Sequence, residues 1–211
     1  MQEKRISDAV VRRLPRYYRY LGMLREDGRD RISSGELSRI MNLTASQIRQ
    51  DLNLFGGFGQ QGYGYNIANL QEEIGKILGL DRTYSMVIIG AGNLGSALAS
   101  YIRFRERGMF VTGLFDISAA KVGTFIGENM VRHTDELGDF LEKNAVDIAV
   151  LTLPAEGARS VFPVLEEHRV PGIWNFSAID LPVSGGMIAE NVNLSESLME
   201  LTYRLGHTDQ A

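Results

Sequence analysis

The sequence predicts an α/β chain in which a small helical domain with a β-hairpin precedes a doubly wound parallel sheet. From residue 84 onward, short apolar runs alternate with amphipathic segments, which is the pattern of βαβ units. Before residue 80, apolar residues recur every three or four positions, as in helices that share one core. We therefore expect three parts: residues 1–80, residues 81–193, and a C-terminal helix within residues 194–211.

The first predicted element is a long amphipathic helix that ends near Asp27-Gly28. Pro15 falls inside it and predicts a kink or a restart, because proline lacks the amide hydrogen that a helix interior requires. The residues of its predicted buried stripe are Ile6, Val10, Leu14, Tyr17, Leu21 and Leu24.

Two capping boxes predict two short helices joined by a tight turn. Ser33-x-x-Glu36 opens a helix over 36–41, and Thr44-x-x-Gln47 opens another that runs through Leu54. Residues 42–43 form the turn between them. This arrangement is a helix-turn-helix, whose second helix can enter the major groove of DNA.

The second of these helices carries a polar face with the donors and acceptors that read base edges. Residues 55–65 then alternate glycine with aromatic and amide side chains, which predicts a β-hairpin wing. A solvated polar helix face and an unstructured glycine-rich loop are the plainer alternatives. The candidate DNA-binding residues are Ser46, Gln47, Arg49, Gln50, Asn53, Gln60, Gln61, Gly62 and Tyr63.

A further helix over residues 67–80 is expected to bridge the two domains and to end at Gly79. The predicted strands that follow cover residues 84–90, 110–115, 146–153 and 172–176, with a strand-like segment at 129–132. The predicted helices between them cover residues 93–106, 134–143 and 155–168.

One motif in this second part points to a ligand. An apolar strand leads directly into Gly90-x-Gly92-x-x-Gly95 and then into a helix. The three glycines permit a tight turn, a close approach of backbone amides to a pyrophosphate, and close packing of the helix on the sheet. The phosphates would lie at the helix N-terminus. An ordinary tight strand–helix turn is the alternative.

Asp116 supports the dinucleotide interpretation, because it follows the next apolar run about 20 residues after the last glycine. A carboxylate there can accept hydrogen bonds from the adenosine ribose and repels a 2′-phosphate, so we expect NADH and NAD⁺ as ligands. The candidate cofactor-binding residues are Gly90, Ala91, Gly92, Asn93, Leu94, Gly95, Asp116, Lys121, Thr152, Pro154, Asn175 and Phe176.

Composition narrows the class of protein. The 211 residues contain no cysteine, which excludes disulfides and thiolate chemistry, so any redox sensing must depend on a ligand. No apolar run approaches the ~20 residues of a membrane span, and we expect a cytoplasmic protein. Residues 1–67 hold 11 Lys and Arg against 7 Asp and Glu, whereas the whole chain has a net charge of −4. A basic N-terminal part is consistent with nucleic-acid binding.

No catalytic constellation accompanies the dinucleotide motif. His133, His168 and His207 are isolated in sequence, and we expect structural or exposed roles for them. No metal-binding motif is present either. A dinucleotide site without a catalyst indicates a sensor. A small NAD-dependent oxidoreductase and a nucleotide-regulated module that binds protein through its helix-turn-helix are the two rival interpretations.

The order of these motifs over nearly the whole chain resembles the Rex family of bacterial redox-sensing transcriptional repressors. The motifs that carry the resemblance are Ser33-Ser34-x-Glu36-Leu37, Gln47-Ile48-Arg49-Gln50-Asp51-Leu52, Phe55-Gly56-x-Phe58-Gly59, Gly64-Tyr65, Ile77-Leu78-Gly79-Leu80, Gly90-Ala91-Gly92-Asn93-Leu94-Gly95 and Asn175-Phe176. The resemblance implies a homodimer with a winged-helix domain, a Rossmann domain for NAD(H) and a C-terminal helix swapped onto the partner. It also implies binding to palindromic operators in double-stranded DNA and release by NADH.

The resemblance further implies roles for single residues. Arg49 matches an arginine of the recognition helix, and Gln50 stands where many members have lysine. Arg19 and Tyr101 match two members of a polar switch, and Asn193 occupies the position of its acidic member. Asparagine can form a hydrogen bond there but no salt bridge. Leu194 replaces an aromatic residue that some members have at the next position.

Overall fold

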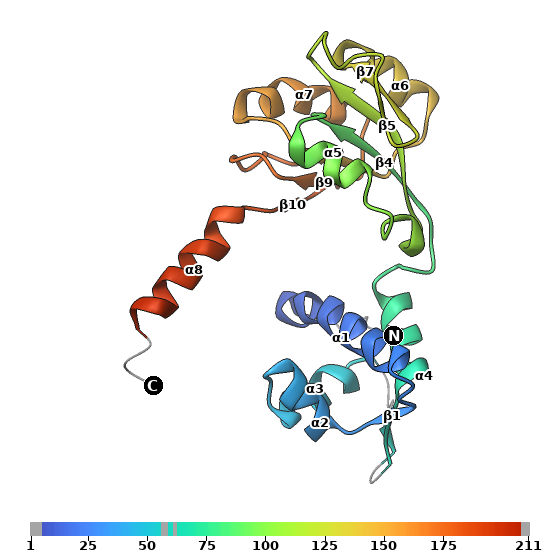
Figure 1. Ribbon diagram of the computed structural model, residues 1–211, viewed down its shortest axis with the longest axis vertical. Helices are drawn as coiled ribbons and strands as arrows, with labels where there is room; N and C mark the ends of the chain where they lie inside the picture. The colour runs from blue at the N-terminus through green and yellow to red at the C-terminus, as the bar shows by residue number, and fades with distance from the viewer. Residues whose placement is uncertain (1–5, 56–58, 61–62, 208–211) are drawn as a thin grey trace. The chain divides into compact units, whose positions relative to one another are not determined.

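The computed structural model describes residues 6–55, 59–60 and 63–207, and the chain divides into two compact units, Met1–Arg82 and Thr83–Ala211 (Figure 1). The first unit is mainly helical with a small sheet, and the second is built around a mostly parallel sheet. The predicted α/β class is confirmed. No helix in the described part of the chain is both long enough and apolar enough to cross a bilayer.

The described residues of the first unit form four helices and a three-stranded sheet. The helices are α1 (Asp8–Glu26), α2 (Ser34–Met41), α3 (Ala45–Asn53) and α4 (Ile67–Ile77). The strands β1 (Arg31–Ile32), β2 (Gly59–Gln60) and β3 (Gly64–Asn66) pair in the order β1-β3-β2. Helix α1 packs along α4, and α2 packs along α3 (Figure 1).

Helix α1 is continuous through Pro15, so the predicted restart is wrong. The buried stripe explains this, because Leu14 before the proline and Tyr17 and Leu21 after it all belong to the core of the unit. Their burial outweighs the missing hydrogen bond. Ile6 lies before the helix and is only half-buried.

The helix-turn-helix has the caps that the sequence predicts, with one correction. The Ser33 hydroxyl accepts from the Glu36 amide, and the Glu36 carboxylate accepts from the Ser33 amide, so this capping box is complete. Thr44 likewise accepts from the Gln47 amide. The Gln47 side chain does not return to the cap, because it donates to Asp51 one turn later. The second capping box is therefore only half formed.

The predicted hairpin is present as β2 and β3, which pair antiparallel. Strand β1, which no pattern predicts, extends the small sheet on the other side of β3. Gly64 has a φ of +71°, and a Cβ there would lie 2.7 Å from the carbonyl oxygen of Ile32, so this position requires glycine. Residues 56–58 and the predicted contacts Gln61 and Gly62 lie outside the described residues.

The second unit has a seven-stranded sheet with the strand order β10-β9-β8-β4-β5-β7-β6. Only β6 is antiparallel to its neighbour. The strands are β4 (Tyr84–Ile89), β5 (Met109–Asp116), β6 (Phe125–Ile126), β7 (Asn129–His133), β8 (Ile148–Leu151), β9 (Gly172–Asn175) and β10 (Ile188–Asn191). The six parallel strands have the Rossmann order, and the direction of winding reverses between β4 and β8.

Helices cover both faces of this sheet. On β4, Val87 and Ile89 face the core under α6 (Leu137–Lys143) and α7 (Ala155–Glu167). The alternate residues Met86 and Ile88 face the opposite core, where Leu98 of α5 (Asn93–Ala99) packs. Alternate side chains of a strand point to opposite faces, so a strand with two cores is apolar throughout.

The extent of one predicted helix differs from expectation, and so does the burial of another. The predicted helix 93–106 ends at Ala99, and the 3₁₀ turns η1 (Arg105–Arg107) and η2 (Thr134–Glu136) follow later. The chain leaves the helix because Phe104 turns inward to pack edge-on against Trp174, 5.8 Å between ring centroids. The last helix, α8 (Leu194–Gly206), lies within the predicted C-terminal segment 194–211, but it buries none of its residues.

Candidate nucleotide site and helix-turn-helix surface

The turn after β4 requires glycine at two positions for reasons within the protein. Gly90 has a φ of +105°, and a Cβ there would lie 2.7 Å from the carbonyl oxygen of Thr152. A Cβ on Gly95 would collide with the carbonyl oxygen of Gly90. The Thr152 hydroxyl donates to that same Gly90 oxygen at 2.7 Å, so the end of β8 holds the turn in place. The turn is therefore rigid and preformed.

Gly92 is different, because the protein itself does not require it. Its φ is −73°, which any residue adopts, and among the described residues no atom lies within 4 Å of where its Cβ would be. Glycine here keeps the space above the turn open. The space suits a group that must approach the backbone amides closely, and the pyrophosphate of a dinucleotide is such a group.

Asp116 lies at the end of β5, beside this turn. Its Oδ2 accepts from the backbone amide of Ala91 at 2.7 Å, and its Oδ1 accepts from the amide of Ser118 at 2.8 Å. The Lys121 ammonium lies 3.2 Å from Oδ2. The carboxylate thus joins the glycine turn to the loop after β5, where the ribose of a bound dinucleotide is expected.

The charge of Asp116 is stabilised although the residue is only 7% exposed. Burial disfavours the carboxylate, but the hydrogen bonds from Ser118, Lys121 and Ala91 outweigh it and hold the pKa of Asp116 below its ordinary value. Asp116 is therefore ionised at neutral pH. An ionised carboxylate accepts from hydroxyl groups and repels phosphate.

The remaining candidate cofactor residues lie in two places. Some are at or after the carboxyl ends of β8 and β9, close to the point where the strand order reverses. The others are in the first turn of α5. Pro154 precedes the first turn of α7, and Leu94 of α5 is 37% exposed. Asn93 is the first residue of α5. Asn175 is fully buried, donates to Ile179 and Asn191 and accepts from Ser177, so it shapes the loop after β9. The Phe176 ring packs against the Trp174 ring in a tilted arrangement, 4.7 Å between centroids.

The three histidines have local roles. His133 pairs in register with Asp116 on the neighbouring strand, and its Nδ1 accepts from the backbone amide of Asp135. His168 and His207 each contact the carbonyl oxygen four residues earlier in their own helix, at 2.8 and 2.7 Å. Within the described residues, no cluster of three or more His, Asp or Glu side chains could hold a metal ion.

The helix-turn-helix presents most of the predicted polar face to solvent. Ser46, Arg49, Gln50 and Asn53 are exposed on α3, opposite the buried Ile48 and Leu52. Arg49 is held by a hydrogen bond of 3.0 Å to the hydroxyl of Ser34 on α2. In the hairpin, Tyr63 is 69% exposed beneath the Arg31 guanidinium, and Gln60 belongs to β2.

Gln47, in contrast, is half-buried, and its side chain donates to a hydrogen-bonded cluster around Asp51 that the sequence analysis does not predict. Asp51, on the inner face of α3, is fully buried and binds Arg13 and Tyr17 of α1. The sequence does hold a sign of this cluster. Asp51 follows Ile48 by three residues, which places a charged side chain on the apolar face of the helix, where a charge needs a partner.

The proposed switch residues belong to both units. Arg19 is exposed on α1, and its guanidinium lies over the Tyr20 ring. Tyr101 is 47% exposed and packs edge-on against Phe104 at 4.9 Å. Asn193 caps its own helix, because its Oδ1 accepts from the backbone amide and hydroxyl of Ser195.

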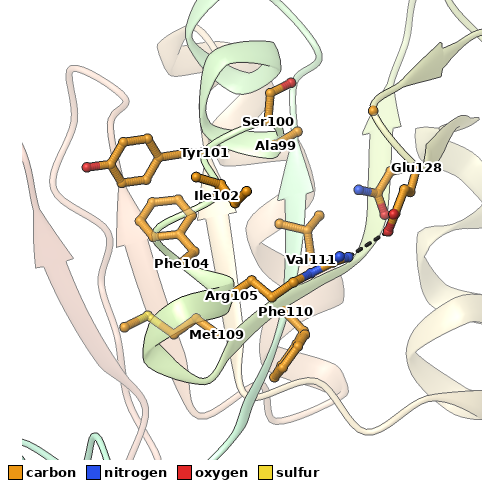
Figure 2. Close-up of a pocket in the computed structure, with 12 residues that line it drawn as sticks. Ala99, Ser100, Tyr101, Ile102, Phe104, Arg105, Met109, Phe110, Val111 and Glu128 are labelled. Carbon is orange, nitrogen blue, oxygen red and sulfur yellow. Dashed lines mark hydrogen bonds and ion pairs between the residues drawn. The ribbon is translucent and has the colours of Figure 1, made fainter.

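A hollow of about 210 Å³ lies beside Tyr101, between the turn after α5 and the start of β5 (Figure 2). The Arg105–Glu128 ion pair, 2.6 Å, lies at its margin. Strand β5 separates this hollow from Asp116, since seven residue steps of a strand span roughly 20 Å. The hollow is thus separate from the dinucleotide turn.

A helix-turn-helix with a hairpin, followed by a Rossmann domain with an acidic residue at the second strand, defines a DNA-binding regulator that carries a nucleotide site. Two family models agree with this class. Residues 5–53 match the model described as "Putative DNA-binding protein N-terminus", and residues 81–179 match the model of a CoA binding domain.

Whole-chain relatives identify the family. A redox-sensing transcriptional repressor Rex of Clostridioides difficile (strain 630) is 55% identical, with 95% of each chain covered. The crystal structure of RSP in complex with β-NAD⁺ and operator DNA is 49% identical, has a TM-score of 0.90, and covers 97% of this chain and 94% of its own. The structure of RSP in complex with β-NADH is 46% identical, also with a TM-score of 0.90, and covers 98% and 97%. The chain belongs to the Rex family of redox-sensing transcriptional repressors.

Membership of this family confirms the resemblance that the sequence shows. It also confirms the prediction that the chain is a regulator and not an enzyme. One family model matches residues 5–53, the other matches residues 81–179, and the RSP structure covers 97% of this chain. The predicted combination of a DNA-binding part and a Rossmann part is therefore confirmed as well.

Proposed function

We propose that this chain represses transcription by binding a palindromic operator, and that binding of NADH by its second unit releases the operator. The observation that carries the proposal is the pair of RSP structures, one with β-NAD⁺ and operator DNA and one with β-NADH, which match this chain over 97–98% of its length. A cysteine-free chain must sense redox state through such a ligand.

The residues of the second unit fit a dinucleotide. The open position at Gly92 supports pyrophosphate binding at the turn between Gly90 and Gly95. The ionised Asp116 supports recognition of the adenosine ribose, with Lys121 beside it. The two redox forms, NAD⁺ and NADH, differ at the nicotinamide ring, in its charge and its planarity, so a sensor must distinguish them there. Thr152, Pro154, Asn175 and Phe176 belong to the strand ends nearest to that part of the ligand in this proposal.

The first unit binds DNA through α3 and the hairpin in this proposal. The exposed side chains of Arg49, Gln50 and Asn53 supply donors and acceptors for base edges. In this proposal, Ser46 at the start of α3 and Tyr63 in the hairpin contact the sugar-phosphate backbone of the DNA. Arg31 is within cation–π distance of Tyr63 and adds positive charge to the hairpin.

The functional unit in this proposal is a homodimer in which α8 packs on the partner subunit. Leu194, Leu198, Leu201 and Leu205 are each at least half exposed on α8, and so large an apolar face is costly in water. The second unit also has an apolar hollow of about 570 Å³ lined by residues such as Met86, Trp174 and Ile188. A two-fold dimer suits a palindromic operator, since both half-sites meet the same helix.

Communication between the units is assigned to Arg19, Tyr101 and Asn193. All three carry polar groups with exposed surface, and Asn193 lies at the start of α8, where the dimer contact begins. The amide of Asn193 restricts this switch to hydrogen bonds.

We place the protein in the cytoplasm, where both chromosomal operators and the NADH pool are found.

Binding to labelled genomic fragments, measured by fluorescence anisotropy, tests the proposed function. We expect NADH to weaken binding and NAD⁺ to leave it intact, with CoA as the control ligand because it also carries an adenosine and a pyrophosphate. Operator binding that ignores NADH, or that responds equally to CoA, contradicts the proposal. Reaction of NADH with a substrate at catalytic rates would instead support the oxidoreductase rival.

A further inference from the structure

The recognition helix α3 is anchored to α1 through one buried carboxylate. Asp51 has no solvent exposure, and Arg13 contacts it with both arms of its guanidinium, Nε to Oδ2 at 2.7 Å and Nη2 to Oδ1 at 2.8 Å. The Tyr17 hydroxyl donates to Oδ2 at 2.9 Å. The Gln47 side-chain amide donates to Oδ1 at 2.8 Å. Each oxygen thus accepts two hydrogen bonds, and the charge is fully compensated.

The cluster keeps Asp51 ionised. Burial favours the neutral acid, but the hydrogen bonds from Arg13, Gln47 and Tyr17 outweigh it, so the pKa of Asp51 is below its ordinary value. An ionised carboxylate accepts hydrogen bonds and donates none.

This property fixes the orientation of the Gln47 amide. Only its NH₂ group can face Asp51, so its Oε1 must lie on the other side of the amide. Within the described part of the chain, no donor meets Oε1. Gln47 lies in the first turn of α3, where recognition helices contact bases.

We propose that Asp51 is a positioning residue for base recognition, which orients Gln47 so that its Oε1 accepts from an exocyclic amino group in the major groove. The proposal rests on the DNA-binding function proposed above. Two bases offer such a group in the major groove, adenine with N6 and cytosine with N4. Guanine and thymine present acceptors at the corresponding positions, so the oriented amide discriminates against them.

The first experiment identifies the base. A duplex selected by the parent protein from genomic fragments is altered at one half-site position at a time, with purine in place of adenine or pyrimidin-2-one in place of cytosine, which removes only the amino group. We expect one position at which this removal weakens parent binding about 3- to 10-fold, the size of one neutral hydrogen bond. Gln47→Ala should abolish the effect at that position and at no other. If no position depends on Gln47, the inference is wrong although the DNA-binding function stands. If the parent binds no fragment, the proposed function itself fails.

The second experiment tests positioning by Asp51. Asp51→Asn places a group there that donates as well as accepts, so the Gln47 amide can turn. We expect discrimination at the Gln47-dependent position to fall below 2-fold, with discrimination at the other positions retained. Tyr17→Phe is the matched control, because it removes an equally buried hydrogen bond from the other oxygen and leaves the Gln47 contact in place. Equal weakening at all positions by Asp51→Asn would assign Asp51 a purely structural role and overturn the proposal.

A third measurement needs no Asp51 variant, in case that substitution prevents folding. In the parent, NMR should show slow solvent exchange of the Gln47 side-chain amide, because one proton is bonded to the buried carboxylate. The exposed Gln50 amide provides the internal reference. Exchange of Gln47 as fast as that of Gln50 overturns the proposal.

Discussion

At the end of β5, Asp116 is the residue that we propose selects which dinucleotide the second unit accepts. Its carboxylate is ionised and faces the region where an adenosine ribose is expected. We predict that calorimetry will find NADH bound at least about tenfold more tightly than NADPH, a difference of roughly 1.4 kcal/mol. Asp116→Ser should narrow the gap, because the Lys121 ammonium then faces the 2′-phosphate without a competing carboxylate. Similar affinities of the parent for both ligands would remove Asp116 from this role.

Arg49 offers a second test at the residue scale. It is exposed on α3 and held by Ser34. We predict that Arg49→Ala weakens operator binding by about 1–3 kcal/mol and removes the preference at one base pair, if its guanidinium reads a guanine. NADH binding should not change. Competition assays against mutated operators check this, and a uniform loss across all sequences would reduce Arg49 to a phosphate contact.

The buried Asp51 makes the stability of the first unit depend on pH. Its pKa is lower in the folded state than in the unfolded chain, so the folded state binds fewer protons across the carboxyl range. The stability that Asp51 contributes is therefore complete at neutral pH and is lost as the pH falls through its folded-state pKa.

We predict that Asp51→Asn lowers the free energy of unfolding by roughly 1.5–3 kcal/mol at neutral pH, the cost of losing hydrogen bonds to a charged group. The difference between parent and variant should shrink on acidification. Urea unfolding of the full chain, followed by the NMR signals of Leu14 and Ile48, measures it. A difference that grows toward acid pH contradicts the assignment.

Helix α8 exposes a row of leucines along one face. Its leucines are 51–68% exposed. We predict that truncation after Asn193 yields a monomer or an aggregate with poor operator affinity, because the helix supplies the dimer contact in our proposal. Light scattering together with anisotropy checks both properties. A truncated chain that remains dimeric and binds the operator would eliminate the swapped-helix arrangement.

The elements that the sequence predicts well are those with strong periodicity or capping chemistry. The stripe of α1, the Ser33 capping box and the apolar strand β4 are all found at or near their expected positions. Short strands such as β1 and β10 escape prediction, because two to four residues carry too little pattern and depend on a partner strand for their hydrogen bonds. The early end of α5 depends on the packing of Phe104 against Trp174, which periodicity does not reveal.

The candidate site residues also fall into two groups, those that a sequence motif predicts and those that only packing of the helices brings together. The sequence predicts the glycine turn and Asp116 as site residues, because a motif records the local geometry at both positions, and a hydrogen bond joins the two in the structure. The cluster around Asp51 was missed because Arg13 and Asp51 are 38 residues apart and meet only after α1 and α3 have packed. The sequence therefore predicts Gln47 only as a DNA contact and does not reveal its hydrogen bond to Asp51.

For the molecule as a whole, the central claim is that NADH and operator DNA compete through the conformation of one protein. Linkage then requires reciprocity: the factor by which NADH weakens operator binding equals the factor by which the operator weakens NADH binding. This requirement holds whichever residues carry the coupling.

Calorimetric titration of NADH into the free protein and into the protein saturated with operator is the most direct test. We predict that the operator raises the Kd for NADH by roughly 5- to 150-fold, which corresponds to a coupling free energy of about 1–3 kcal/mol. The same titration with NAD⁺ should show a much smaller change. An NADH affinity that is identical with and without operator would contradict the central claim.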